Sequence, residues 1–156
     1  MGKDKYTFIK IQEERLKNME QIKERYLNIQ SNLASFLPQG CLFVSVLYVA
    51  ECFNKKPIDF LDCFVYSLKK KWIKKDGYVN DSLAILKYLT NVNWQRSIYS
   101  INEPLPLASS WHFIEKWVNP LGVNHFRPCD FEIFENCRIV KNGKITGYYF
   151  YFPLGV

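Results

Sequence analysis

Cys41 is the residue of this sequence best suited to act as a nucleophile. It follows Gln39-Gly40 and opens the apolar segment CLFVSVLYVA, whose length predicts a buried helix. A thiol at a helix start lies at the positive end of the helix dipole, beside unpaired amide donors, and both lower its pKa. Gly40 leaves room for a substrate carbonyl, and the Cys41 amide would face a developing oxyanion. These features predict acyl transfer by a thiolate; the alternative is a small buried cysteine.

A cysteine nucleophile needs a base, and the chain has two histidines, His112 and His125. His125 belongs to residues 123–127, a short predicted strand that would fix the direction of its side chain. His112, in the segment SSWHF, is the second candidate. For each, the alternative is a histidine packed at a strand edge or among aromatic residues. The polar residues that could orient an imidazole follow downstream: Glu135 and Asn136 are the first candidates, and Asp130 is the third.

Helices are predicted in the first 90 residues, because apolar side chains recur there at spacings of three and four. The expected helices are residues 8–34, the segment that Cys41 opens, residues 57–72 with Pro57 in the first turn, and a helix capped by Asn80 or Asp81. Their apolar positions are Met19, Ile22, Tyr26, Ile29 and Leu33, then Phe60, Leu61, Phe64, Leu68 and Trp72, and finally Leu83, Ile85, Leu86 and Leu89.

Strands are predicted in the second half, where helical periodicity fades and prolines interrupt the chain. The candidates are residues 111–118, 123–127, 131–135, 138–140 and 145–152, and the Asn-Gly pair before the last of these is a strong hairpin signal. Helices followed by antiparallel strands indicate an α+β fold. We therefore expect a single domain over residues 1–156, with an N-terminal helix (1–36), a helical half containing Cys41 (38–90) and a β-sheet half containing His125 (98–152).

Composition limits the class of protein. The chain has 156 residues, 48% hydrophobic and 23% charged, with a net charge of +6, which is typical of one globular domain. Its five cysteines are odd in number and include no C-x-x-C pair, so neither a zinc site nor a disulfide framework is expected, and no cofactor is implied. The longest apolar run is too short to cross a bilayer, and no secretory signal is seen. We expect a cytoplasmic protein with reduced thiols.

Lysines cluster around Trp72, at Lys69, Lys70, Lys71, Lys74 and Lys75. Such a cluster can contact phosphates, but it also occurs where a helix ends, because lysines offset the helix dipole and keep the surface soluble. No nucleic-acid motif accompanies it, so nucleic-acid binding is not expected.

The order Cys, His and then an amide or acid, with helices before strands, resembles the papain-like cysteine peptidase superfamily. The resemblance is greatest to its compact bacterial branches, the double-glycine leader peptidases and their relatives, which open with Gly-Cys and carry a His-aromatic pair on a later strand. The pattern GCLFVSVLYVAE, NHF, IFEN and VKNGKI also looks like a family of small proteins associated with spirochaete plasmids and phages. The resemblance covers roughly residues 38–152.

The resemblance implies a papain-like fold with Cys41 as nucleophile, His125 as base, and Glu135 or Asn136 as the third residue. It differs at the oxyanion position: these peptidases carry a glutamine six residues before the cysteine, where this chain has Ser35. Gln39 and Gly40 are the nearest candidates to contact a substrate oxyanion, and Gln30 lies further upstream.

Two functions from different classes follow. The first is a thiol hydrolase that cleaves a peptide or amide bond: His125 deprotonates Cys41, the thiolate attacks the carbonyl, and water releases the acyl-enzyme. The second is a catalytically inactive papain-like domain that binds a peptide or protein partner. The separation between the Cys41 sulfur and the His125 ring distinguishes them, since a working pair requires roughly 3 to 5 Å.

Overall fold

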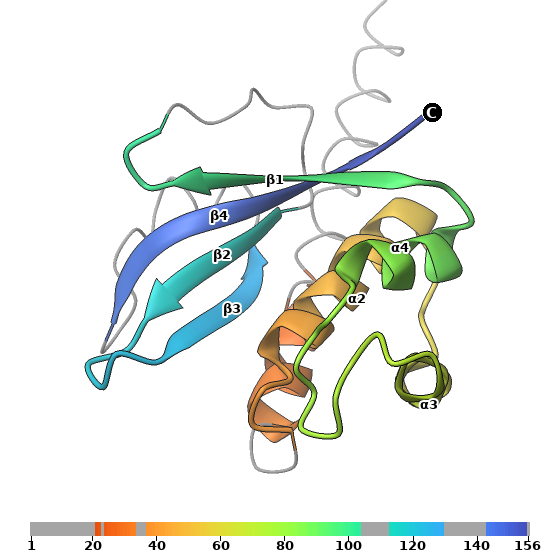
Figure 1. Ribbon diagram of the computed structural model, residues 1–156, viewed down its shortest axis with the longest axis horizontal. Coiled ribbons are helices and arrows are strands. Elements are labelled where there is room, and N and C mark those ends of the chain that lie inside the picture. Colours follow the sequence, from red (N-terminus) through yellow and green to blue (C-terminus); the bar gives the residue numbers. More distant parts are fainter. Residues whose placement is uncertain (1–20, 23, 34–36, 104–112, 130–142, 156) are drawn as a thin grey trace, which may run out of the picture.

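The computed structural model describes residues 21–22, 24–33, 37–103, 113–129 and 143–155. In these residues helices precede strands, and the strands form one antiparallel sheet with the helices gathered on one side of it (Figure 1). The elements are α2 (Cys41–Asn54), α3 (Phe60–Lys69), α4 (Ser82–Thr90), β1 (Trp94–Ser100), β2 (Phe113–Val118), β3 (Asn124–Cys129) and β4 (Lys144–Pro153). Residues 21–33, apart from 23, are helical and precede α2. The predicted α+β class is confirmed.

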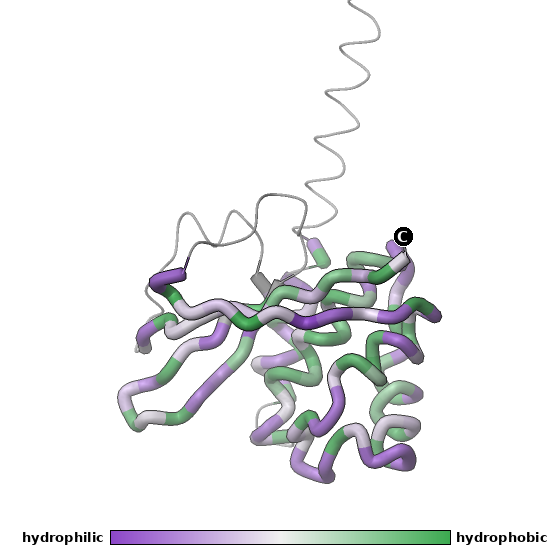
Figure 2. Tube along the Cα trace, turned by 45° about the horizontal axis from the view of Figure 1, so that its top comes forward, coloured by the Kyte–Doolittle hydropathy of each residue, from purple (hydrophilic) through white to green (hydrophobic). Residues whose placement is uncertain are grey.

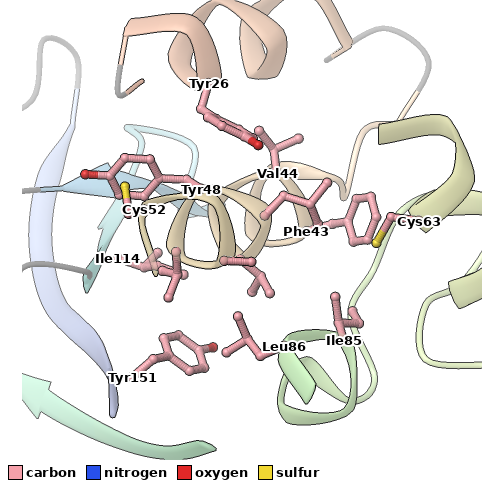
Figure 3. Packing of buried hydrophobic residues seen from close by; sticks show 14 of the residues in the cluster. Tyr26, Phe43, Val44, Tyr48, Cys52, Cys63, Ile85, Leu86, Ile114 and Tyr151 are labelled. Carbon is pink, nitrogen blue, oxygen red and sulfur yellow. The ribbon is translucent and has the colours of Figure 1, made fainter. Parts of the chain in front are cut away.

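Helix α2 is the predicted buried helix and forms the centre of the core. Its side chains are buried continuously from Phe43 to Cys52. This all-round burial is possible because other elements surround it: Tyr26 packs from residues 21–33, while α4 and the sheet supply the other neighbours, including Ile114 (Figure 3). The helix ends at Asn54, and Lys55 then takes a left-handed φ of 57°.

Helix α3 begins later than predicted. Its first residue is Phe60, and the Asp59 carboxylate accepts a hydrogen bond from the Asp62 amide at 3.0 Å. Pro57 therefore precedes the cap and does not occupy the first turn. The physical reason is that a carboxylate satisfies free helix amides, whereas proline only tolerates a helix start.

The same helix also ends earlier and faces differently. It stops at Lys69, and Lys71 takes a left-handed φ of 63°, so Trp72 lies beyond the helix. Its buried side chains are Cys63 and Ser67, while Leu61, expected on the apolar face, is 69% exposed. The predicted face included Leu61 because the pattern was counted from too long a helix.

Helix α4 confirms the predicted cap. Asp81 fills this role, since its carboxylate accepts from the Ala84 amide at 3.0 Å. Asn80, the alternative, donates from its side chain to the Lys71 carbonyl at 3.1 Å and so ties down the turn after α3.

The sheet has the strand order β1-β4-β2-β3, and all its neighbours are antiparallel. Strands β2, β3 and β4 confirm the predictions at 111–118, 123–127 and 145–152. Strand β1 begins four residues before the predicted β half, because its largely polar sequence WQRSIYS becomes a strand only through pairing with β4. Pro128 lies within β3, where it is tolerated because β3 is an edge strand.

The two faces of the sheet carry different clusters. Ile114, Tyr151 and Trp94 belong to the main core with α2, whereas Ile145, Tyr148 and Phe150 form a second buried cluster. Along β4 the two sets alternate from Tyr148 to Tyr151, whereas Ile145 joins the second cluster across an irregularity in the pairing of β4 with β2. In Figure 2 the turns between the helices are largely hydrophilic, which leaves the apolar residues along helices and strands to form these clusters. The predicted strands 131–135 and 138–140 lie outside the described residues, as does the first half of the hairpin turn, up to Asn142.

Candidate functional site

Cys41 lies where the sequence predicted, at the first residue of α2, and is partly exposed. Strand β3 lies beside this helix, and the Phe126 backbone approaches the thiol. Burial raises the pKa of the Cys41 thiol; backbone hydrogen bonds at Phe126 and Leu42 act against this increase without cancelling it. The expected lowering of the pKa by the helix start is therefore wrong, because desolvation penalises the thiolate more strongly.

The space beside Gly40 is filled by the protein itself. A Cβ added at Gly40 would lie 2.8 Å from the Leu37 Cβ, and one added at Gly77 would lie 2.8 Å from the Gly40 Cα. Gly40 is buried, and the neighbouring Gln39 amide donates to the Asp76 carbonyl at 3.0 Å. The 74–77 turn packs closely against the start of α2. This packing explains why residue 40 is a glycine, whereas the sequence had suggested that Gly40 leaves room for a substrate carbonyl.

His125 lies on β3, as predicted, but its ring is held by residues of β2 and the following turn. The imidazole stacks on Trp117, with centroids 4.6 Å apart and planes 22° apart. Its Nε2 lies 3.2 Å from the Asn119 side-chain nitrogen. Asn119 is thus the polar neighbour of His125, a role that sequence reasoning gave to residues further downstream. The short sequence separation of Asn119 and His125, across the turn of a β2–β3 hairpin, was the signal available in the sequence.

The reactive groups of Cys41 and His125 lie on opposite sides of the sheet. Phe126 packs against the main core with α2, whereas Trp117, the stacking partner of His125, packs against the second cluster. Successive residues of a strand point to opposite faces, so the His125 ring faces away when Phe126 faces α2. No hydrogen bond joins the Cys41 sulfur to the His125 ring in the described residues. The structure brings the two elements together but separates the two side chains.

Gln30 is a further residue at this place. Its side-chain nitrogen donates to the Phe126 carbonyl, which ties residues 21–33 to β3 next to Cys41. The carbonyl oxygen of the same amide is buried and has no hydrogen-bond partner in the described residues. An oxyanion-hole glutamine must present a free donor to substrate. Gln30 already uses one of its two side-chain N–H donors on the backbone of β3.

The remaining predicted site residues lie outside the part of the chain that the structure describes: His112, Asp130, Glu135 and Asn136. Among the described residues, no group of three or more potential metal ligands is found. No helix among them is long and apolar enough to cross a membrane. Cys52 and Cys63 are both buried.

Comparison with known proteins found no match for this chain among protein-family models, curated proteins or solved structures.

Proposed function

We propose that this chain is a catalytically inactive papain-like domain that acts by binding a peptide or protein partner. The observation that supports this is the separation of Cys41 from His125 by the strand backbone of β3. A histidine that stacks on Trp117 and contacts Asn119 has no path for taking a proton from the thiol. The papain-like arrangement is proposed on three features together: a buried helix opening with a cysteine, an antiparallel sheet packed on it, and helices before strands.

Two further features fit an inactive domain. Burial keeps the Cys41 thiol protonated at neutral pH, which favours packing over nucleophilic attack. Packing of Gly77 against Gly40 closes the approach that a substrate carbonyl would need. We also propose a cytoplasmic location, since Cys41 and Cys63 carry free thiols, which suit a reducing compartment.

The test is the rate at which iodoacetamide alkylates each cysteine of the folded chain, followed by peptide mass spectrometry from pH 6 to 9. For an unactivated, buried thiol, the rate at Cys41 rises with pH, and its midpoint lies above that of an ordinary free thiol. The His125→Ala variant should change this rate less than about twofold. A rate that is already at its plateau below pH 7, and that falls in His125→Ala, would contradict the proposal.

The second candidate function is a thiol hydrolase, favoured by the position of Cys41 at the start of a buried helix beside β3. In that case Cys41 attacks the substrate, and the base is His125 or His112. Wild-type chain and the Cys41→Ser, His125→Ala and His112→Ala variants are incubated with a mixed peptide library, and new termini are identified by mass spectrometry. Cleavage that requires Cys41 and either histidine supports the hydrolase; the inactive domain predicts none.

A further inference from the structure

Helix α3 exposes apolar side chains on the face turned away from the core. Leu61 is 69% exposed and Val65 56% exposed, and they lie four residues apart on one side of the helix. Tyr88 of α4, which is 39% exposed, stacks on Tyr66 of α3 with centroids 4.2 Å apart. Trp72 completes this group, with its ring 5.5 Å from that of Tyr66. We call these five residues, with the lysines described next, the α3–α4 surface.

Lysines border the α3–α4 surface. Five of the seven residues from Lys69 to Lys75 are lysine, and all five are exposed. Lys70 lies over the Tyr66 ring at 5.6 Å, which places the positive charge beside the aromatic group. No acid in the described part of the chain forms an ion pair with these lysines. Their mutual repulsion is therefore relieved only by solvent, salt or an anionic partner.

The nearest acids are already used by the protein. Asp76 accepts from the Tyr78 amide at 3.0 Å, and Asp81 caps α4. Asp62 accepts from the Tyr88 hydroxyl at 3.2 Å and so holds the ring stack in place. The aromatic group is consequently ordered before any partner arrives, which lowers the entropy cost of binding.

Three classes of anionic partner can be compared with this surface. Nucleic acid needs open ring faces for its bases, but Tyr66 and Tyr88 stack on each other, and the cluster lacks arginines for bidentate phosphate contacts. An anionic membrane would press the exposed Asp62 carboxylate, which follows Leu61 and accepts from the Tyr88 hydroxyl, against lipid of the same charge. An acidic protein segment offers carboxylates for the lysines and apolar side chains for Leu61 and Val65.

From this comparison we infer that the α3–α4 surface binds a partner-protein segment that combines acidic and apolar side chains. The inference rests on the proposed binding function and names the surface and the partner's chemistry. The apolar side chains of the partner segment supply affinity. Its carboxylates supply orientation and a faster encounter with the lysines.

The experiment selects displayed random peptides of about 16 residues on the full chain at roughly physiological salt, where charges beyond about 8 Å are screened. Selected peptides should be enriched in Asp or Glu together with Leu, Ile or Phe. Their affinity, measured by fluorescence anisotropy, should fall roughly tenfold in Lys74→Gln/Lys75→Gln and by a similar factor in Leu61→Ser/Val65→Ser. The charge-matched control Lys56→Gln/Lys144→Gln and the apolar control Leu121→Ser should bind as wild type does.

Three results would overturn the inference: selected peptides with no acidic excess, equal binding by all the variants, or no enriched peptide. Stronger binding by phosphatidylglycerol vesicles or by an oligothymidylate, lost in the lysine variant, would also overturn it in favour of lipid or nucleic acid. The alkylation of Cys41 is measured separately, so failure here leaves the inactive-domain proposal intact, and activation of Cys41 leaves this surface intact.

Discussion

Replacing Glu51 tests how residues 21–33 are held against α2. Glu51 is only 4% exposed in the middle of the core. It accepts from the Tyr26 hydroxyl at 3.1 Å and from the Ile58 amide at 3.3 Å, and it forms an ion pair with Arg25. One carboxylate therefore joins the helical residues 21–33 to α2 and to the turn before α3.

The magnitude follows from what each partner loses in Glu51→Ala. Tyr26 is 3% exposed, so its hydroxyl would be left buried without an acceptor, which costs about 1 to 3 kcal/mol. The Ile58 amide adds about 1 kcal/mol. Arg25 is 46% exposed on its side chain and can be rehydrated, so the ion pair contributes at most about 1 kcal/mol. Glu51→Ala should lower the free energy of unfolding by about 2 to 5 kcal/mol, and Glu51→Gln, which keeps an acceptor, by about 1 kcal/mol.

Urea unfolding followed by circular dichroism provides the measurement, provided that the m-value stays constant. Tyr26→Phe should cost about 1 kcal/mol in the wild-type chain, but in Glu51→Ala it should raise the free energy of unfolding by about 1 to 3 kcal/mol, because the orphaned hydroxyl is then removed. If Glu51→Gln lowers the free energy of unfolding as much as Glu51→Ala does, the ion pair dominates over the role of Glu51 as an acceptor, and the prediction is wrong.

Two further predictions concern a glycine and a buried thiol. Gly77→Ala should lower the free energy of unfolding by at least about 1 kcal/mol more than Gly122→Ala. Both glycines have left-handed φ angles, +91° and +80°. Of the two, only Gly77 would bring an added Cβ against backbone, at 2.8 Å from the Gly40 Cα. Equal losses in urea titrations would show that the turn does not pack closely there. Burial raises the pKa of Cys63 to about 11, so the folded chain holds this proton more tightly than the unfolded chain does. The resulting stability is present below about pH 8.5 and is lost as the pH rises toward 11, and Cys63→Ala should flatten the fall in unfolding free energy between pH 8 and 10 by about 1 kcal/mol per pH unit. An unchanged slope would contradict this assignment.

Local patterns predicted much of the fold. The apolar run from Cys41, the Asp81 cap and the strand segments at 111–118, 123–127 and 145–152 concern neighbours within a few residues, and the structure has a helix, a cap and strands there. The positions of Cys41 at a helix start and of His125 on a strand were predicted for the same reason. Where the prediction failed, as for Leu61 in α3, the expected helix was too long, because the local pattern did not show where the helix begins and ends.

Strand β1 shows a limit of another kind. Its sequence is mostly polar, so no alternation of apolar and polar residues indicated a strand. The strand forms because its backbone pairs with β4, some fifty residues later in the chain. Hydrogen bonds between distant strands do not leave a pattern in the sequence of one strand.

The candidate site was decided by tertiary structure. The sequence determined that Cys41 begins a buried helix and that His125 lies in a strand, because helix length, caps and alternation are local. Whether the His125 ring points toward α2 depends on which side of the sheet α2 covers, and a one-residue change of strand register would reverse the direction of the ring. The pKa of Cys41 depends on how much water β3 and its neighbours exclude, which outweighs the helix start. The direction of a side chain and the solvation of its charge are set by residues far away in the chain, so only the folded structure fixed them.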